Sequence, residues 1–529
     1  MAVLITALIL MAAINVSAEE ELYFRFTIKE RQEITQITRL VSIENVRRDT
    51  VYAIGTTAQL EKIKLAGYIV ELLPHPSSLA RPEMSQNQRD ITAWDVYPTY
   101  EAYVQMMNDF ETNYPGLCHT YSAGASVQGR ELLFVKISDN VDVEEAEPEV
   151  MYTSSMHGDE TTGYVLMLRL IDSILTTYGT DIEITNLVNS MEIWINPLAN
   201  PDGAYHTGNA SVAGAIRYNA NLVDLNRNFP DPQDGDHPDG SIWQPETIAM
   251  MNMATRQSWI LSANFHGGAE VVNYAWDTWV TRHADDAWYI DVCRQYAESC
   301  QAHAPVGYMN DLNDGITNGW DWYEVNGGRQ DYMTYWRGCR EVTIELSNIK
   351  LLSAGLLPSY WGYNRVSLFD WLRQANYGIR GIVTDAVTGL PLAATISVID
   401  HDLDSSEVYT DPDVGDYYRM IAAGTYTLRF TAQDYFPKDV AGVTIGAKSS
   451  VTINVSLNKS WICGDIDGNG QFQPIVELNY LVNRIFRGGP LPPNPQAADL
   501  NGSGGNANIL DLNYIVNFIF RGGAAPACL

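Results

Sequence analysis

The sequence predicts an α/β domain with a central mixed, mostly parallel sheet flanked by helices. A small α+β domain is expected before it, and a β-sandwich and a small all-α repeat after it. Three observations support this prediction. Strand and helix patterns alternate between residues 91 and 377, as in α/β domains. Residues 378–457 hold short alternating segments separated by Gly, Pro and Asp, which favours a sandwich. In the tail, Glu477-Leu-Asn-Tyr recurs as Asp511-Leu-Asn-Tyr, which indicates a duplicated unit.

The N-terminal segment, residues 1–18, is expected to be a secretory signal. Its mostly apolar run ends in Val-Ser-Ala before three glutamates, and small residues there suit a signal peptidase. A buried N-terminal strand or helix is the alternative. No Lys or Arg lies near Met1, which suggests that the true start of the chain lies upstream. No later run approaches ~20 apolar residues, so no membrane span is expected. We therefore expect a secreted or extracellular protein.

Charge and cysteine content agree with that location. The 529-residue chain has a net charge of -31, which argues against a nucleic-acid partner because little would neutralise phosphates. Six cysteines fit an oxidising compartment, and their even number permits full pairing. Cys293 and Cys300 fall in one expected helix, about 10 Å apart along its axis, too far for a disulfide. Cys463 and Cys528 bracket the tail repeat and could clasp its ends.

Residues 19–80 predict the small α+β domain. Segments 22–28 and 51–56 alternate like strands, and 57–65 has a helical pattern. A polar linker follows, in which Arg81 and Arg89 are candidate cleavage points.

The elements of the central domain follow between residues 91 and 377. Segments 131–137, 149–153, 191–195 and 259–265 are expected to be strands, and 161–175 a helix. The sandwich, residues 378–457, is expected to have about seven strands, including 381–384, 394–399, 425–430 and 451–457. No catalytic constellation occurs in the sandwich. The tail, residues 461–529, is expected to form two helices, each preceded by a loop rich in Asp, Asn and Gly.

Metal-binding chemistry is indicated by His157-Gly-Asp-Glu160, which follows an expected strand. A histidine and a carboxylate three residues apart at a strand end can reach one ion from the same side. His266, after the strand 259–265, is the third candidate donor. Two histidines and a glutamate with an open fourth position form a catalytic zinc set. The alternative for each histidine is a hydrogen-bonded core residue.

The segments between and after these donors carry a more specific signal. They are Asn200-Pro-Asp-Gly203, Arg217-Tyr-Asn-Ala-Asn-Leu-Val-Asp224-Leu-Asn226-Arg227-Asn228, His266-Gly-Gly, Trp276-Asp277, Tyr323-Glu-Val-Asn-Gly-Gly-Arg329-Gln330 and Thr343-Ile-Glu345-Leu-Ser347. Their order and spacing closely resemble the zinc metallocarboxypeptidases, in particular the carboxypeptidase N/E/D/M group.

The resemblance implies a zinc-dependent peptidase that removes the C-terminal residue of peptides or proteins. Matching the segments position by position implies zinc ligands at His157, Glu160 and His266, a general base and acid at Glu345, a carbonyl-polarising group at Arg217, terminal-carboxylate binders at Asn226, Arg227 and Tyr323, and a carboxylate at Asp224 that orients a ligand imidazole. The chemistry is consistent, because zinc lowers the pKa of a bound water and a carboxylate can take and return its proton. An arginine fork fits a planar carboxylate. Surface ion pairing is the alternative for both arginines.

Substrate preference depends on three residues. In the resembling group, the positions of Asp277 and Gln330 line the pocket for the last side chain and favour Lys or Arg. Arg329 stands where that group has an uncharged residue. If Arg329 turned into the pocket, it would cancel Asp277 and admit acidic or neutral ends. Basic preference is our expectation, with a cell-wall peptide or an acidic protein tail as the other substrates considered.

The flanking segments carry resemblances of their own. The sandwich resembles the transthyretin-like domain that follows this enzyme in the same group. Residues 19–80 are similar to the pre-domains of bacterial secreted carboxypeptidases, and an inhibitory propeptide is one hypothesis for them.

The tail resembles a bacterial dockerin, an EF-hand-like repeat, which implies calcium and a cohesin-like scaffold partner. Candidate calcium ligands are Asp465, Asp467, Asn469 and Glu477 in the first loop and Asp499, Asn501, Ser503 and Asp511 in the second. Oxygen donors at positions one, three and five with glycine at six suit such a loop. Glu477 and Asp511 fall one residue later than the usual closing position. Two helices held by apolar packing alone are the alternative.

Three classes of function therefore remain open: an active exopeptidase, a catalytically silent relative that binds peptides or glycans, and a scaffold-bound adhesion protein. Loss of Glu345 or of a zinc ligand would mark the second class, and the sequence retains them all. Retention of these residues favours the first class.

Overall fold

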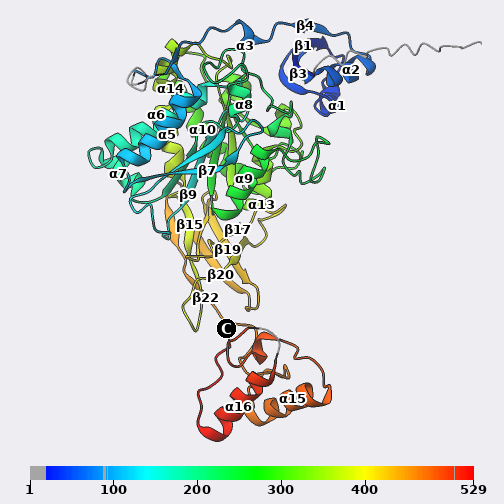
Figure 1. Cartoon of the computed structure of the whole chain (residues 1–529), viewed down its shortest axis with the longest axis vertical. Coiled ribbons are helices and arrows are strands. Elements are labelled where there is room, and N and C mark those ends of the chain that lie inside the picture. Colours follow the sequence, from blue (N-terminus) through cyan, green and yellow to red (C-terminus); the bar gives the residue numbers. More distant parts are fainter. Residues whose placement is uncertain (1–18, 87–90, 92, 505–506, 529) are drawn as a thin grey trace, which may run out of the picture. The chain divides into compact units, whose positions relative to one another are not determined.

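The computed structural model describes residues 19–86, 91, 93–504 and 507–528 (Figure 1). The chain divides into two compact units, Met1–Asp142 with Glu149–Arg373 and Val143–Pro148 with Gln374–Leu529. The expected signal segment and Arg89 lie outside the described residues. Within the described part of the chain, no helix combines the length and apolarity needed to cross a bilayer.

The N-terminal block, residues 19–80, forms an antiparallel four-stranded sheet in the order β2-β3-β1-β4. Its elements are β1 Glu21–Thr27, α1 Ile34–Ile37, β2 Ser42–Arg47, β3 Thr50–Thr56, α2 Thr57–Leu65, β4 Glu71–Leu73 and α3 Pro76–Leu79. Phe24, Phe26 and Val51 are buried in its core. Thr56 caps α2 by accepting a hydrogen bond from the backbone N–H of Gln59, which explains why the helix begins where the sequence predicts. The two expected strands and the helix are thus confirmed.

An eight-stranded mixed sheet forms the middle of the first unit, in the order β13-β12-β14-β11-β9-β10-β8-β7. Its strands are β7 Cys118–Ala125, β8 Glu131–Ile137, β9 Glu149–Ser154, β10 Glu192–Asn196, β11 Leu261–His266, β12 Glu270–Tyr274, β13 Ile316–Asn318 and β14 Arg340–Leu346. The central strands β14, β11, β9 and β10 run parallel, and β8 and β7 pair antiparallel with their neighbours. Strand β12 pairs antiparallel with β14 and parallel with β13. A mixed sheet with a parallel centre confirms the predicted α/β class, and it brings the carboxyl ends of β9, β11 and β14 to one edge.

Helices cover both faces of this sheet (Figure 1). They are α5 Tyr100–Asn113, α6 Thr162–Thr177, α7 Ile182–Val188, α9 Pro245–Arg256, α10 Asp286–His303, α13 Arg329–Arg337 and α14 Leu357–Gln374, with the shorter α8 Pro201–Ala204, α11 Asp311–Gly315 and α12 Gly319–Trp322 and the strand pair β5 Met84–Ser85 and β6 Tyr97–Pro98. Figure 1 shows α5, α6 and α7 on one side of the sheet and α9 and α13 on the other. Met151 and Trp194 pack with residues of α9 and α13. Successive strand residues point to opposite faces of the sheet. Since helices cover both faces, every residue of β9, β10 and β11 is buried.

The second unit contains two four-stranded sheets around one core. The strands are β15 Gly378–Asp385, β16 Ala394–Val398, β17 Val408–Tyr409, β18 Asp416–Arg419, β19 Gly424–Ala432, β20 Lys438–Ile445, β21 Ser450–Thr452 and β22 Val455–Leu457. The segment expected as one strand, 451–457, is divided, because β21 and β22 pair with different halves of β15. Between them the side chain of Asn454 accepts the backbone N–H of Ile382 at 3.0 Å.

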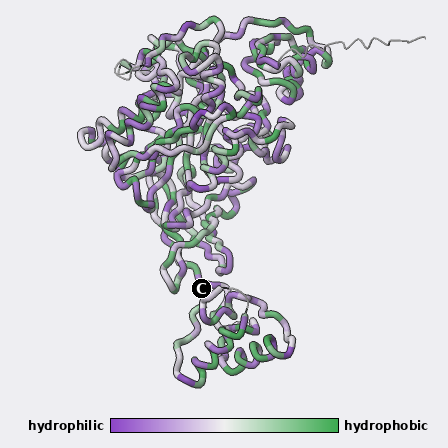
Figure 2. Tube along the Cα trace, in the orientation of Figure 1, coloured by the Kyte–Doolittle hydropathy of each residue, from purple (hydrophilic) through white to green (hydrophobic). Residues whose placement is uncertain are grey.

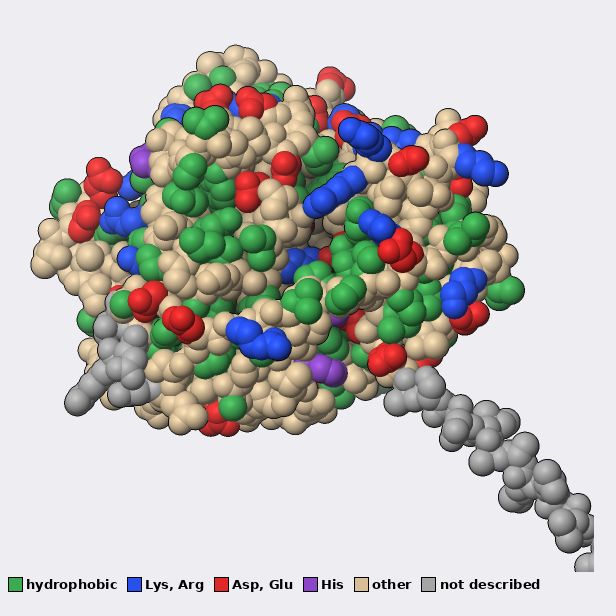
Figure 3. Space-filling view, turned by 90° about the horizontal axis from the view of Figure 1, so that it is seen from above, with side chains coloured by type: hydrophobic (Ala, Val, Ile, Leu, Met, Phe, Trp, Pro, Cys, Tyr) green, Lys and Arg blue, Asp and Glu red, His purple; other side chains and the backbone are tan. Residues whose placement is uncertain are grey.

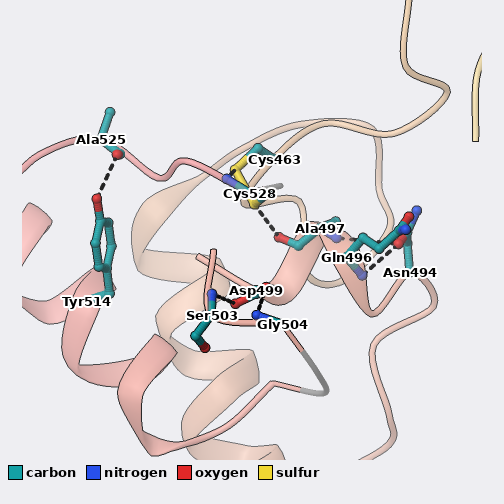
Figure 4. Close-up of a disulfide and its surroundings, with 10 residues drawn as sticks. All are labelled: Cys463, Asn494, Gln496, Ala497, Asp499, Ser503, Gly504, Tyr514, Ala525 and Cys528. Atoms are coloured by element: carbon teal, nitrogen blue, oxygen red, sulfur yellow. Dashed lines mark hydrogen bonds between the residues drawn. A yellow bond between two sulfur atoms is a disulfide. The ribbon is translucent and has the colours of Figure 1, made fainter. Parts of the chain in front are cut away.

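The tail consists of α15 Pro474–Arg487 and α16 Ile509–Arg521. Hydrophobic residues recur along both helices (Figure 2), and Leu481 and Ile515 are buried between them. A disulfide joins Cys463 to Cys528 (Figure 4), as expected. The other four cysteines are buried free thiols, so full pairing, which their even number permits, does not occur.

Candidate metal centre and active site

Three metal donors meet where two neighbouring parallel strands end. His157 and Glu160 follow β9, and His266 is the last residue of β11. The Nδ1 atoms of the two histidines lie 3.1 Å apart. Oε2 of Glu160 lies 3.0 Å from Nδ1 of His157 and 2.9 Å from Nδ1 of His266. All three side chains are buried. This donor set fits zinc, because tetrahedral ligands at ~2.0–2.1 Å would lie about 3.3 Å from one another.

The loop that carries the first two donors is packed tightly against its neighbour. A Cβ atom at Gly158 would lie 2.2 Å from the carbonyl carbon of Gly203. A side chain there would push the loop outward and displace His157 and Glu160. Glycine is therefore required at this position.

Both histidines are held through their second ring nitrogen. Nε2 of His157 lies 3.1 Å from Oδ1 of Asp224, which keeps the proton on Nε2 and leaves Nδ1 free for a metal. Nε2 of His266 lies 2.8 Å from the side-chain amide of Asn264. Burial lowers the pKa of His266 to about 4, so this ring is neutral near pH 7, as metal binding requires. Although burial opposes it, His157 and Lys350 hold the pKa of Glu160 well below its usual range.

Glu345 lies beside the metal donors. Strand β14 pairs in parallel with β11, and Glu345 is in register with His266. Burial, and then the Glu160 carboxylate, raise the pKa of Glu345 well above its usual range. Its Oε2 atom is buried and has no hydrogen-bond partner among the described residues. A carboxyl group with a free oxygen at this place can accept and return a proton.

Arg217 is buried next to Glu160. Its Nε donates to Oδ2 of Asp224 at 2.9 Å, and its Nη1 lies 3.5 Å from Oε1 of Glu160. Nη1 also donates to Oε1 of Glu44, a residue of the N-terminal block, at 2.9 Å. Burial opposes the charge, but Asp224 and Glu44 raise the pKa of Arg217 well above its usual value. A permanent positive charge therefore faces the site.

Asn226, Arg227 and Tyr323 line the same cavity as the metal donors. Nη1 of Arg227 donates to the backbone carbonyl of Asn226 at 2.7 Å. The Nε and Nη2 atoms of Arg227 are buried and have no hydrogen-bond partner within the described part of the chain. The Tyr323 hydroxyl lies 3.5 Å from the carbonyl oxygen of Ile43. Buried donors without a partner fit a site for an anionic group.

Asp277 lies at another part of the cavity wall. Its Oδ1 accepts from Nδ2 of Asn273 and Nε2 of Gln330, each at 3.0 Å. Burial raises the pKa of Asp277 to about 6. A Cβ atom at Gly319 would lie 1.7 Å from Oδ1 of Asp277. Any residue other than glycine at 319 would therefore collide with the Asp277 carboxylate.

Arg329 turns away from this wall. Its Nε donates to Oε1 of Glu341 at 2.9 Å, and its Nη1 contacts the hydroxyl of Thr153. Arg329, Glu341 and Thr153 are all fully buried. Arg329 therefore does not cancel the charge of Asp277, which resolves the alternative that the sequence left open.

The cavity and the open solvent at its mouth together enclose ≈ 560 Å³ of space free of protein atoms. It brings together the three metal donors and the other sequence-predicted residues that line it: Glu345, Arg217, Asn226, Arg227, Tyr323 and Asp277. Asp224 and Gln330 lie behind the lining, in contact with His157 and Asp277 respectively.

The N-terminal block occupies one side of this cavity. Ile43 and Glu44 of β2 line it, and the neighbouring Ser42 donates from Oγ to Oδ2 of Asp224 at 2.5 Å. Glu21 of β1 accepts the backbone N–H of Arg217 at 3.0 Å. The block thus contacts residues that the sequence assigns to substrate binding.

Two charged lining residues were missed by the sequence reasoning. Lys350 follows β14, and its Nζ lies 3.0 Å from Oε1 of Glu160 and contacts Oε2 of Glu44. Although burial opposes it, Asp159 and Glu44 raise the pKa of Lys350 well above its usual value. The place of Lys350 in the loop after the Glu345 strand was a usable signal, because that loop lies at the same sheet edge. Glu44 gave no comparable signal.

The two tail loops have the same local geometry. In the first, the Asp465 carboxylate accepts the N–H groups of Asn469 and Gly470. In the second, Asp499 accepts those of Ser503 and Gly504 (Figure 4). Carboxylate oxygens of Asp465, Asp467 and Glu477 lie within 4.8 Å of one another. Asn501 presents Oδ1 to the N–H of Ser503, and Asp511 accepts from Asn508.

Comparison with known proteins agrees with this site. The zinc carboxypeptidase family model matches residues 103–367. Mouse carboxypeptidase D is 38% identical over 383 residues, which cover 69% of this chain and 27% of that protein. The chain thus spans about a quarter of that relative's length. The human carboxypeptidase N catalytic chain is 34% identical over 68% of this chain and 85% of its own length.

Solved structures agree on the fold. Carboxypeptidase A from Helicoverpa armigera superposes with a TM-score of 0.52 at 17% identity, covering 66% of this chain and 97% of that chain. Thrombin activatable fibrinolysis inhibitor gives a TM-score of 0.51 at 14% identity, covering 66% and 98%.

Proposed function

Because this chain belongs to the zinc carboxypeptidase family, we propose that it hydrolyses the C-terminal peptide bond of peptides or proteins. The observation that carries the proposal is the convergence of His157, Glu160 and His266 beside Glu345 in one cavity. The cavity also holds Arg227, whose buried donors suit a chain-terminal carboxylate.

Each residue has a defined task in this reaction. Zinc held by the three donors would activate a water molecule and polarise the scissile carbonyl. Glu345 takes a proton from the water and returns it to the departing amine. Arg217 places a permanent positive charge where the carbonyl oxygen gains negative charge. Asn226 and Arg227 hold the terminal carboxylate and so position the last peptide bond.

The last side chain of the substrate is proposed to be Lys or Arg. Asp277 provides a buried carboxylate for it, and Gln330 and Asn273 hold that carboxylate in place. Because Arg329 is paired with Glu341, the negative charge of Asp277 stays available to a basic side chain. A buried charge left alone is costly, so a basic partner is favoured over a neutral one.

The N-terminal block is proposed to restrain the enzyme until the linker after it is cut. This follows from the contacts of Glu44 with Arg217 and Lys350 and of Ile43 with Tyr323. A substrate would need these same side chains. Arg81 is exposed in the linker and offers a site for a trypsin-like protease.

Export and attachment through the tail are further parts of the proposal. Residues 1–18 would direct secretion, and residues 461–529 would bind a cohesin-like scaffold with calcium in their loops. In support, exposed apolar residues recur at matching positions in the two tail helices, as Val476 with Leu510 and Phe486 with Phe520. Calorimetric titration of the full chain with Ca²⁺ and with Mg²⁺ tests the ion. Heat from neither ion would contradict calcium binding.

The central experiment is release of free amino acid from blocked dipeptides ending in Arg, Lys, Phe or Glu. It compares the full chain before and after limited trypsin treatment, the Glu345→Gln variant, and a chelator-treated sample. Fast release of Arg and Lys after trypsin, abolished by the variant and by the chelator, is the expected result. Release of Glu or Phe alone would contradict the role of Asp277. No release from any peptide would favour a silent peptide binder.

A further inference from the structure

Two buried cations in the cavity share one carboxylate. Oε1 of Glu44 accepts from Nη1 of Arg217 at 2.9 Å, and Oε2 of Glu44 contacts Nζ of Lys350. The three side chains are 6–9% exposed. A single carboxylate therefore bridges from one cation to the other, which sets the separation between them.

The place of Lys350 in the cavity is defined by its neighbours. Its Nζ lies 3.0 Å from Oε1 of Glu160, and its Cε lies 3.3 Å from the position of a Cβ atom at Gly268. Asp277 and Asn226 lie together elsewhere, since a Cβ at Gly328 would be 3.6 Å from one and 3.7 Å from the other. Lys350 therefore lies beside the metal donor Glu160, whereas Asp277 and Asn226 both lie next to Gly328.

A bound peptide must cross the metal donors from the chain-end pocket. With its terminal carboxylate at Arg227, its scissile carbonyl lies at Arg217. Glu44 bridges Arg217 to Lys350, so Lys350 lies within the span of one glutamate carboxylate of the group that faces the scissile carbonyl. The side chain of the residue before the scissile bond starts one carbon from that carbonyl, so a carboxylate of Asp or Glu can reach Lys350 across the separation that Glu44 bridges.

We propose that Lys350, once Glu44 has withdrawn, binds the carboxylate of an acidic residue immediately before the scissile bond. Lys350 is then a specificity-determining residue, and Glu44 occupies its subsite in the intact chain. The inference rests on the proposed exopeptidase function and adds a second preference to it. The preferred ends are Glu-Arg, Glu-Lys, Asp-Arg and Asp-Lys. Opposite a neutral side chain Lys350 keeps only its contacts with Glu160 and Asp159 and does not regain the ion pair lost with Glu44, which is why the glutamine analogue is disfavoured.

The test compares two blocked dipeptides, Glu-Arg and Gln-Arg, which differ only in the charge of the first residue. The kcat/KM ratio for the pair is measured at pH 7.5 on the trypsin-treated full chain. The expected ratio is at least tenfold in favour of Glu-Arg. In Lys350→Met it should fall to about one, and in Lys350→Arg it should be retained. The ratio is independent of any general loss of activity in these variants. Lys448→Met, at an exposed lysine of the second unit, is the matched control and should keep the wild-type ratio.

Two results would overturn the proposal. One is a wild-type ratio near one. The other is an equal loss on both peptides in Lys350→Met with the ratio unchanged, which would mean that Lys350 only positions Glu160. If no peptide is cleaved, the proposed function fails separately. Calorimetric titration of Glu345→Gln with both peptides then decides the subsite, and equal affinities would reject it.

Discussion

Replacement of Glu44 by Gln is the most direct test of restraint by the N-terminal block. Glu44 is one acidic partner of both Arg217 and Lys350, and the three side chains are nearly inaccessible to solvent. Glutamine has the same shape but no charge. The substitution therefore removes the ionic part of the contact between the block and the cavity while leaving the backbone of β2 in place.

The size of the effect follows from this burial. Removing one partner of a buried ion pair costs about 3–5 kcal/mol. At 1.36 kcal/mol per tenfold change, the lower figure corresponds to about 150-fold weaker docking of the block. Some of that energy is recovered by hydrogen bonds of the glutamine amide, so we expect about 100-fold.

The assay is release of arginine from a blocked dipeptide, expressed as the activity of the uncut chain divided by that of the trypsin-treated chain. In Glu44→Gln this quotient should rise about 100-fold or reach one, whichever comes first. Glu71→Gln is the control, because Glu71 lies in the same block but its ion pair with Arg25 is exposed. The reasoning is refuted if Glu44→Gln and Glu71→Gln give the same quotient as the wild type.

Four further predictions concern the site and the tail. Because the pKa of Asp277 is raised to about 6 by burial, its charged form is lost as pH falls through 6. The ratio of kcat/KM for Arg ends to kcat/KM for Phe ends, in which the titration of Glu345 cancels, should therefore fall about tenfold between pH 7 and pH 5 and stay flat in Asp277→Asn. Gly319→Ala places a methyl group on the Asp277 carboxylate, so kcat/KM for Arg ends should fall by at least tenfold while the melting temperature reports on folding separately. Asp224→Asn should weaken zinc binding about 10–100-fold, measured by competition with a chromogenic chelator; unchanged affinity would contradict the support given to His157. Cys463→Ser opens a link between residues 65 apart in sequence and should destabilise the tail by about 4 kcal/mol, seen as faster hydrogen exchange in α15 and α16 and no change in β11.

The sequence was sufficient for the parts of the site that follow from local order along the chain. His157 and Glu160 come directly after a strand, and His266 ends another, so parallel pairing of those strands brings them together. Glu345 is in register with His266 for the same reason. The mixed sheet was predictable because strand and helix patterns alternate through the domain.

The parts that could not be predicted depend on partners distant in sequence. Arg329 is the first residue of helix α13, and its ion pair with Glu341 on β14 decides which way its side chain points. Nothing in the sequence around Glu341 marks it as that partner. The contact of Glu44 with Arg217 spans 173 residues, and nothing near Glu44 marks it. The division of segment 451–457 into two strands is equally non-local, since it is imposed by the pairing with β15.

Charge is not segregated on the molecular surface in the view of Figure 3, where acidic and basic side chains are interspersed with hydrophobic ones. The excess of acidic residues is therefore not gathered into a single patch on that face. Interspersed charges of both signs give no strong one-sided field over that face.

Asp224 is shared between the docked block and the metal centre. Its carboxylate accepts from Ser42 of the block and also holds the ring of His157. Docking and metal binding therefore use one common group, and any coupling free energy between them is reciprocal. By whatever factor the docked block changes the affinity for zinc, zinc must change the affinity for the block. In the proposed mechanism, zinc supply and proteolytic release would be two inputs to the same equilibrium.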